Sequence, residues 1–525
     1  MRKLLCMLLV LSLLCAVACG KDEGDTSSAP VDDSTAVSTP EADGNSSTVV
    51  DEGDLVEVPD ITGMSPEEAE KTLKDAGFDV KVREKNYDDV PKGEVAEIDL
   101  KIGESYEKGT KCFLFISGGK TIAAQTLEYK QSALVENRPV LEQGANSDYQ
   151  PTNYEYVKAA WLSQYDMETV YNSGSGQRPE EECRERAKMV LKGLKDLGIN
   201  TLFVQVRPNG DSFYPSAYYC PSKYVVGMYG LDFTYDPFRI IVEEAHALNL
   251  SIHAWINPLR CMVASSVELI NISYGLRKFY QEHMDDYVIK FEGNLYLNPG
   301  REEVRQLIID GAAEIVRYYD VDGVHIDDYF YPTNMGFEYD KAAFLDQAEY
   351  TDPETFRKES LNKLISGLYA AVKAENPKAL FGISPAGKPA LVRGAYGDID
   401  TWLSTEGYTD YIMPQLYWGL QLKNSQFDML YVQWSNLVKV DSIRIIPGVT
   451  LEFASKGSTS EWINNKDVLK RCISFAEDYG NCSGFSIFSS SLILSHTSGE
   501  RVPSTLEEVD NLMDFVKDKE DILLS

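Results

Sequence analysis

The long C-terminal part of the chain alternates apolar runs with helical stretches, and this alternation constrains the fold most. Eight apolar runs of strand length follow one another. Between them lie helical patterns such as Glu180–Leu197, whose apolar residues share one face and which Gly198 ends. Eight strands separated by helices predict an α/β fold, a closed parallel (β/α)8 barrel. The runs are Val157–Leu162, Thr201–Val206, Leu250–Ile256, Val321–Ile326, Ala379–Ser384, Tyr408–Leu416, Ile443–Thr450 and Ser483–Phe488.

An open, doubly wound sheet is the alternative, but no GxGxxG follows the first run. In a barrel, alternate side chains point to the axis, and those near the carboxyl end of each strand line a pocket. On the fourth strand, Val324 and Ile326 are expected to face the helices, and His325 and Asp327 the axis. The same alternation predicts inward positions for Gln205, Arg207, His253, Trp255, Asn257, Ser384, Gln415 and Tyr417.

The fourth strand carries the most informative motif, DGVHIDD at residues 322–328. It is similar to the fourth-strand DGxRxD of the α-amylase superfamily, whose last Asp is the nucleophile. It also loosely resembles the DGxDxDxE strand of chitinases, although Tyr329 stands in place of that glutamate. The resemblance therefore implies that Asp327 is a catalytic carboxylate of a glycosidase.

Residues 155–500 resemble the bacterial glycosyl-hydrolase-like family 10 domain. The resemblance rests on motifs that fall in order at successive strands: KAAWLS, QVRPNGDSFYPS, HAWINPLR, GVHIDDYFYP, GISPAG, YTDYIMPQLYW and GFSIF. It implies a barrel glycosidase associated with cleavage of cell-wall glycan, including glycan stripped of its peptides. We expect no cofactor and no metal.

Glycoside hydrolysis usually needs an ionised and a protonated carboxyl group on either side of the bond. Asp327 is the candidate nucleophile or base, and Arg207 or His325 is expected to keep it charged. Glu452 is the first candidate for the acid, followed by Asp211 and Asp328. Strand five ends in Ser384-Pro385, without the glutamate of an amylase. On a 2-acetamido sugar, the carbonyl of the substrate could attack instead, with Asp327 only orienting it.

Polar and aromatic residues at the strand ends are the candidates for substrate contact. They are Arg207, Trp255, Asn257, His325, Tyr329, Gln415, Tyr417 and Trp418. Aromatic rings suit the faces of sugars, although aromatic residues are more often part of a core. The alternative for the acidic pair is a structural role, as helix caps or ligands of a structural ion. Arg207 would then simply neutralise Asp327 as a buried pair.

Residues 55–119 show the pattern of a small folded domain. Ser65-Pro66-Glu67-Glu68 forms a capping box, and an apolar helical stripe then ends at Gly77. The segments VPDITGMSPEEAEKTLKDAGFDVKV, DDVPKGEV and KIGESYEKGTKCFLFISGG resemble a PASTA domain, a βαβββ module. Several such domains bind peptidoglycan or β-lactams, and Leu100 replaces the usual proline of one loop. The alternative role is a rigid spacer.

The N-terminus is typical of an exported lipoprotein. Two basic residues and an apolar run precede Ala16-Val17-Ala18-Cys19, which resembles a lipobox with Cys19 as the lipidated residue. An ordinary signal peptide is the alternative. Residues 20–54 are polar and acidic, as expected for a disordered tether, and 120–154 form a second connector before the barrel domain at 155–520. We therefore expect the protein at the extracellular face of the bacterial membrane, associated with the wall.

Charge and cysteine usage exclude other classes of function. The net charge of −32 argues against a nucleic-acid partner. No CxxC or HExxH motif occurs, and Cys472 and Cys482 could form a disulfide. The expected partner is peptidoglycan or another cell-wall polysaccharide, bound by a monomer anchored to the membrane through its lipid. Two alternatives remain: a non-catalytic carbohydrate-binding scaffold, and a glycosidase for another polysaccharide.

Overall fold

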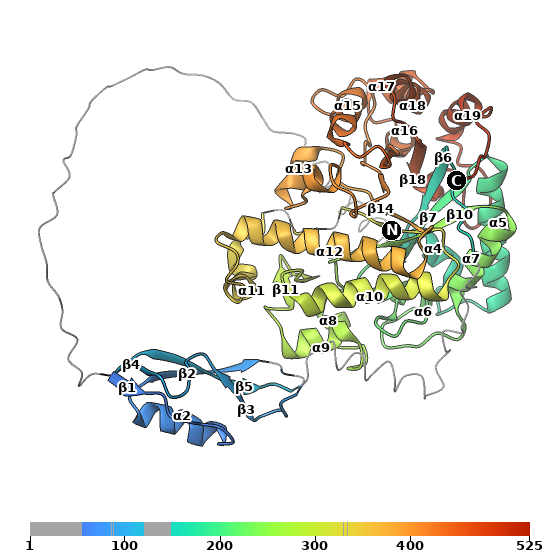
Figure 1. Ribbon diagram of the computed structural model, residues 1–525. Helices are drawn as coiled ribbons and strands as arrows, with labels where there is room; N and C mark the ends of the chain where they lie inside the picture. Colours follow the sequence, from blue (N-terminus) through green and yellow to red (C-terminus); the bar gives the residue numbers. More distant parts are fainter. Residues whose placement is uncertain are drawn as a thin grey trace, which may run out of the picture.

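The computed structural model describes residues 55–524, apart from residues 86, 88, 120–148, 329 and 333. The expected signal peptide, the lipidation site Cys19, the tether and most of the connector lie outside the described residues, as does Tyr329. A small α+β domain and a large α/β domain make up the described chain (Figure 1). Among the described residues, no helix combines the length and the apolar character needed to cross a membrane.

The small domain folds around one helix and two short sheets. The predicted capping box is present: the backbone N–H of Glu68 donates to Ser65 Oγ, and that of Ser65 donates to Glu68 Oε2. Ala69 and Leu73 of the helix are buried against the strands. Strand β1 pairs with β4, and the other sheet has the order β2-β5-β3. The elements are β1 (Leu55–Glu57), α2 (Pro66–Asp75), β2 (Asp79–Lys85), β3 (Val95–Ile98), β4 (Ser105–Glu107) and β5 (Lys111–Ser117).

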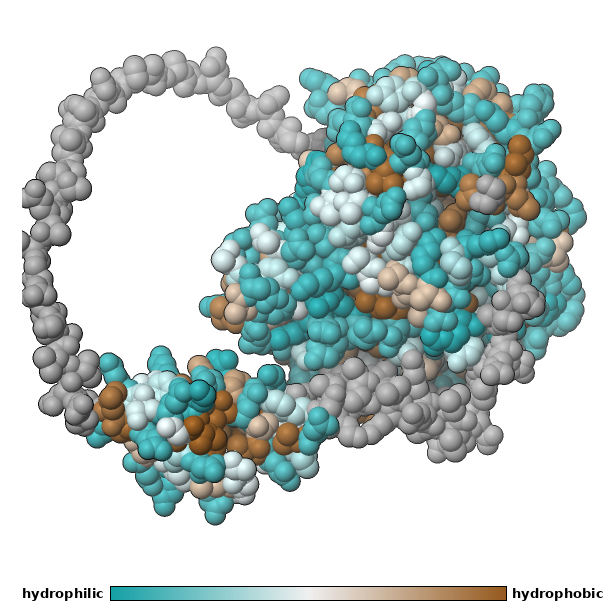
Figure 2. Space-filling view, in the orientation of Figure 1, coloured by the Kyte–Doolittle hydropathy of each residue, from teal (hydrophilic) through white to brown (hydrophobic). Residues whose placement is uncertain are grey.

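The outer face of the three-stranded sheet carries cationic and aromatic side chains. The guanidinium carbon of Arg83 lies 4.2 Å from the centre of the Phe113 ring, and Lys85 Nζ lies 5.7 Å from that of Phe115. On the other face of the same strand, beyond the buried Val80, Val82 is 46% exposed. Figure 2 shows hydrophobic residues breaking the mainly hydrophilic surface of this domain. The strand β2 therefore presents a mixed surface rather than a purely polar one.

The large domain is built on a parallel sheet whose strands match the eight predicted runs. Nine strand segments occur in the described part of the chain, in the order β16-β15-β14-β13-β10-β7-β6-β18-β17. The segments are β6 (Val157–Leu162), β7 (Thr201–Arg207), β10 (Ser251–Ile256), β13 (Gly323–Ile326), β14 (Leu380–Ile383), β15 (Tyr411–Ile412), β16 (Arg444–Ile445), β17 (Gly448–Thr450) and β18 (Gly484–Phe488).

The sheet closes because β16 and β17 are two halves of the seventh strand. Only Ile446 and Pro447 separate them. On one side, Ile446 N donates to Ile412 O at 3.0 Å, and on the other, Ser486 N donates to Pro447 O at 3.1 Å. Proline lacks an N–H, so the ladder is interrupted there without ending the strand. The prediction of a (β/α)8 barrel is confirmed.

Helices cover the outside of this barrel. Each strand leads into one or more of them, and α10 and α12 lie side by side on it (Figure 1). The helices are α4 (Gln164–Tyr171), α5 (Glu180–Asp196), α6 (Lys223–Val226), α7 (Pro237–Ala247), α8 (Ala264–Val267), α9 (Gly275–Glu282), α10 (Glu302–Tyr318), α11 (Lys341–Leu345), α12 (Pro353–Glu375), α13 (Pro389–Gly394), α14 (Ile399–Trp402), α15 (Phe427–Leu437), α16 (Glu452–Lys456), α17 (Ser460–Asn464), α18 (Val468–Tyr479) and α19 (Leu506–Phe515).

The alternation along the strands divides the core into two layers. Val324 and Ile326 belong to the large outer cluster beneath the helices. A smaller cluster fills the barrel itself and consists of Val157, Ala159, Trp161, Phe203, Trp255, Tyr411, Met413 and Ile446. Because the lower barrel is packed with side chains, only its carboxyl end is left for a site.

The six cysteines of the described residues are all free thiols. Cys472 is buried on α18, and the thiol of Cys482 donates to Gly484 O at 3.3 Å. The two cysteines for which a disulfide was considered are therefore not bonded to each other.

Candidate active site

Asp327 follows the fourth strand and points to the barrel axis, as the alternation predicts. The indole Nε1 of Trp255 donates a hydrogen bond to its Oδ2 at 3.0 Å. Trp255 itself stands edge-on to Trp161, within the inner cluster. The side chain of Asp327 is only 2% exposed. It is thus a carboxylate fixed in the upper barrel with little contact with solvent.

Asp328 lies on the other side of β13, toward the fifth and sixth strands. The side-chain amide of Gln415 hydrogen-bonds to its carboxylate and also donates to Ser384 O at 3.1 Å. Burial raises the pKa of Asp328, and the bond from Gln415 opposes the shift. Asp328 is less buried than Asp327. The two adjacent carboxylates are therefore held by partners on opposite sides of one strand.

A chain of neutral polar groups lies beneath the carboxylates. His253 Nε2 and Asn153 Oδ1 are 2.9 Å apart, and Tyr411 OH lies 2.9 Å from His253 Nδ1 and 3.0 Å from His325 Nδ1. An amide oxygen only accepts, so His253 donates to Asn153, Tyr411 donates to His253, and His325 donates to Tyr411. These bonds fix the tautomers of the two histidines: His253 carries its proton on Nε2, and His325 carries its proton on Nδ1.

His325 differs from its expected role as a positive neighbour of Asp327. It is fully buried, and its ring lies 4.9 Å from that of Trp161, centre to centre. Burial, followed by the charge of His253, places the pKa of His325 well below its usual value. Burial is also the main reason why the pKa of His253 falls to about 3. His325 is therefore a neutral group of the barrel core and gives Asp327 no compensating charge.

Arg207 does not point to the axis, contrary to the prediction. A β-bulge between the second and third strands pairs Gln205 with Trp255 but Arg207 with the outward-facing Ile256. One extra residue reverses the side on which the following side chain falls. The Arg207 guanidinium therefore lies over the ring of Tyr219, 4.5 Å from its centre, among the covering elements.

Gln205 and Asn257 lie at the carboxyl ends of β7 and β10 and bond to each other. Gln205 Nε2 donates to Asn257 Oδ1 at 3.1 Å, and Gln205 Oε1 accepts from the backbone of Gln164. Asn257 Nδ2 donates to Pro208 O at 3.0 Å. The two amides are buried and hold the loops after three strands together at the rim.

Asp211, a candidate acid, is sealed inside the loop that follows β7. It has no exposed surface, accepts from Tyr229 OH at 2.9 Å and accepts from the backbone of Asn209. Burial raises its pKa, against hydrogen bonds led by that of Ser222. Its carboxylate is thus engaged by its own loop, which disfavours Asp211 as the acid.

Glu452, the first candidate acid, begins α16 after the seventh strand. Its Oε2 lies 2.6 Å from Lys456 Nζ, one helical turn on, in a partly exposed ion pair. Its backbone N–H donates to Thr450 Oγ1 at 3.2 Å. The ion pair engages the Glu452 carboxylate, whereas Asp328, the third candidate, directly follows Asp327 at the end of the fourth strand and is the better placed of the two.

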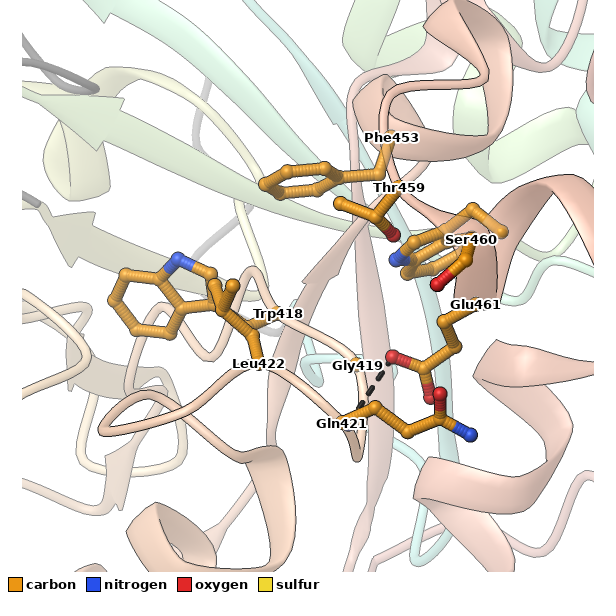
Figure 3. A pocket seen from close by; sticks show the side chains of 9 residues that line it. Trp418, Gly419, Gln421, Leu422, Phe453, Thr459, Ser460 and Glu461 are labelled. Atoms are coloured by element: carbon orange, nitrogen blue, oxygen red, sulfur yellow. Dashed lines mark hydrogen bonds between the residues drawn. The ribbon is translucent and has the colours of Figure 1, made fainter. Parts of the chain in front are cut away.

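Two aromatic residues follow the sixth strand and turn different ways. The Tyr417 ring stacks on that of Phe488, 5.8 Å away. Trp418 instead lines a pocket between this loop and the helices α16 and α17 (Figure 3). Sequence reasoning missed the other residues of this pocket. Phe453 and Trp462, aromatic residues after the seventh strand, were the available signal.

The closed parallel barrel carries two carboxylates at the carboxyl end of its fourth strand, the end at which barrel enzymes place their active sites. The model of the family "Glycosyl hydrolase-like 10" matches residues 156–462, and that of the PASTA domain matches residues 56–118. The first match spans more than half of the chain. The protein belongs to the glycosyl hydrolase-like 10 family and carries a PASTA domain before that domain.

Two relatives share this part of the chain. Glycosyl hydrolase YngK of Bacillus subtilis (strain 168) is 31% identical over 340 residues, which cover 60% of this chain and 64% of that protein. Glycosyl hydrolase DigH of Escherichia coli (strain K12) is 31% identical over 331 residues, which cover 57% of this chain and 73% of that protein. The chain thus spans less than two thirds of the length of the Bacillus relative.

Among solved structures, the glycoside hydrolase domain of PgaB (BpsB) from Bordetella bronchiseptica matches with a TM-score of 0.46 at 11% identity. The match covers 68% of this chain and 99% of that one. The catalytic domain of β-amylase from Paenibacillus polymyxa matches with a TM-score of 0.46 at 11% identity, over 69% of this chain and 99% of that one.

Proposed function

We propose that the protein is a glycoside hydrolase that cleaves cell-wall glycan with the carboxyl groups of Asp327 and Asp328. The observation that carries the proposal is the pair itself, two carboxylates at the end of the fourth strand with partners on either side of it. Membership of the glycosyl hydrolase-like 10 family supports a glycosidase. The PASTA domain supports a wall polysaccharide as the substrate.

In this mechanism, Asp328 is the general acid. A general acid must still carry its proton at the working pH in order to donate it to the glycosidic oxygen. The raised pKa of Asp328 favours this protonated form. As the bond between the anomeric carbon and that oxygen breaks, Asp328 gives its proton to the departing oxygen. It then takes a proton from the water that completes hydrolysis.

Asp327 is the orienting carboxylate or the nucleophile. Its small exposure and its bond from Trp255 favour orientation of a substrate group over direct attack. On a 2-acetamido sugar, Asp327 would accept from the acetamido N–H, and the acetamido oxygen would attack the anomeric carbon. Attack by Asp327 itself is the other route, and it would leave a covalent glycosyl-enzyme.

The PASTA domain and the N-terminal lipid proposed at Cys19 would keep the enzyme at its substrate. A second binding module raises the effective concentration of glycan at the barrel without new contacts there. The proposed location is the extracellular face of the cytoplasmic membrane, with the tether 20–54 giving the barrel reach into the wall.

The test is digestion of purified peptidoglycan, intact and stripped of its peptides, by the purified protein. We expect new reducing ends from the wild type, and a loss of about 100-fold or more for Asp327→Asn and Asp328→Asn. The matched control is Asp196→Asn, an exposed carboxylate at the end of α5, near the opposite end of the barrel. Equal release by Asp327→Asn and the wild type would remove this residue from the mechanism.

The near-complete burial of Asp327 favours a second candidate, a carbohydrate-binding protein without hydrolysis. This candidate predicts that the wild type binds glycan and releases no reducing ends. It also predicts that Asp327→Asn leaves binding unchanged. The same digestion therefore separates the two candidates.

A further inference from the structure

A pocket of about 210 Å³ opens between the loop after β15 and the helices α16 and α17. Figure 3 shows Trp418 on one side and Phe453 and Thr459 on the other, with Glu461 and Gln421 at one end. Its lining comprises Trp418, Gly419, Gln421, Leu422, Phe453, Thr459, Ser460, Glu461 and Trp462. None of these residues takes part in the reaction proposed above.

Aromatic rings form the two walls of the pocket. Trp418 and Phe453 are both partly exposed, whereas Trp462 is buried and stacks behind Phe453 at 6.1 Å and 17°. Lys388 Nζ lies 5.4 Å from the centre of the Trp418 ring, in a cation–π contact. Flat rings that stay partly exposed and are supported from behind suit the apolar faces of a sugar ring.

The polar end of the pocket is fixed in advance of any ligand. The Glu461 carboxylate is buried and accepts from the backbone N–H groups of Leu420, at 2.9 Å, and Gln421, at 3.1 Å. A Cβ on Gly419 would lie 2.3 Å from Glu461 Oε2, so glycine is required for this approach. The negative charge of Glu461 disfavours an anionic ligand here and leaves hydroxyl and amide groups as suitable partners.

The pocket lies within reach of the reacting bond. Trp418 is three residues beyond Gln415, whose side chain contacts Asp328. Three residues of extended chain span at most about 11 Å. A glycan whose cleaved bond lies at Asp328 would therefore bring a ring one or two units away into the pocket.

We propose that this pocket is a distal subsite that binds an uncharged sugar ring of the glycan chain against Trp418 and Phe453. The proposal rests on the proposed function in that it takes a glycan as the substrate. Binding energy from a remote ring can be used at the reacting bond, so the subsite favours longer chains.

The test measures the binding of short and long peptide-free N-acetylglucosamine oligomers to the purified full-length protein. Asp328→Asn serves as the background, so that binding is read without cleavage. With the pocket unchanged, the Asp328→Asn protein should bind long oligomers with a clearly lower Kd than short ones. Trp418→Ala should reduce that advantage about tenfold, and Ser460→Trp, which fills the pocket from an exposed position, should do the same.

Two controls keep the result interpretable. Trp418→Phe keeps a ring and should retain most of the advantage of long oligomers. Tyr479→Ala removes an aromatic residue that is 44% exposed at the end of α18, away from the pocket, and should change nothing. An unchanged advantage in both Trp418→Ala and Ser460→Trp would overturn the subsite, as would the absence of any oligomer binding.

Failure of the hydrolase proposal is read separately. If the enzyme with Asp328 intact releases no reducing ends while long oligomers still depend on Trp418, catalysis is excluded and the subsite stands. If cleavage occurs with no dependence on chain length, the hydrolase stands and the subsite is excluded.

Discussion

The indole of Trp255 holds the carboxylate of Asp327 at 3.0 Å, across the gap between the third and fourth strands. Trp255 Nε1 can only donate, so this carboxylate oxygen is fixed as an acceptor. The ring of Trp255 is in turn held edge-on by Trp161, at 4.8 Å between centres. Packing inside the barrel therefore sets the direction of a carboxylate at its mouth.

Replacing Trp255 with Phe removes this donor and keeps most of the ring. We expect kcat on peptide-free glycan to fall about tenfold or more, because the Asp327 carboxyl group loses the donor that orients it. Reducing-end assays give the rate, and thermal unfolding checks the fold. The control is Trp402→Phe, which removes an indole bond to Asn362 in the outer core. Equal losses in the two variants would show that the effect on rate is structural.

Asp328→Asn should make the protein more stable at neutral pH while lowering its activity about 100-fold or more. Burial raises the folded-state pKa of Asp328 above the ordinary value of 3.8. Its stabilising contribution is therefore complete below that value and is lost as pH rises through the folded-state pKa. We expect the Tm of the variant to exceed that of the wild type more at pH 7 than at pH 4. A difference independent of pH would contradict the raised pKa.

Glu508→Gln tests the same linkage away from the site. Glu508 is buried on α19, accepts from Leu469 N, and its pKa is raised to about 7 by burial. Between the ordinary value of 4.5 and about 7, the wild type loses stability as pH rises, and the variant does not. Chemical unfolding at several pH values should show that the difference in unfolding free energy between Glu508→Gln and the wild type grows over this pH range. The control is Glu507→Gln, which changes the exposed neighbour. A similar pH-dependent difference in stability for this variant would refute the explanation by burial of Glu508.

Arg207→Met should lower stability and leave KM for glycan unchanged. The guanidinium packs on Tyr219 beneath α10, so its loss is expected to cost about 2 kcal/mol of unfolding free energy. Denaturant unfolding and substrate titration give the two quantities. A raised KM with unchanged stability would return Arg207 to the substrate site. Arg186→Met, on the partly exposed face of α5, is the matched control.

The barrel could be predicted from the sequence because its signal is local. Each strand is a short apolar run, and alternation within it placed Val324 and Ile326 outward and Asp327 inward, as observed. The interrupted seventh strand kept its place because Ile446 and Pro447 still bond to both neighbours. Regular periodicity thus predicts both the fold and the faces of its strands.

The site was harder to predict because it depends on contacts between distant residues. One extra residue in β7 turned Arg207 outward, and no local pattern signals that bulge. The carboxylate of Asp211 accepts a hydrogen bond from Tyr229, a residue eighteen positions later in the chain. The contact between Gln415 and Asp328 joins strands that are not neighbours in the sheet. Alternation cannot reveal contacts of this kind.

The most direct test of the central claim compares reducing-end release from peptide-free glycan by the wild type, Asp328→Asn and Asp196→Asn. If Asp328 is the acid of a glycosidase, the wild type and Asp196→Asn will cleave at the same rate. Asp328→Asn will be slower by about 100-fold or more. Equal rates for all three proteins, or no release by the wild type, would contradict the account.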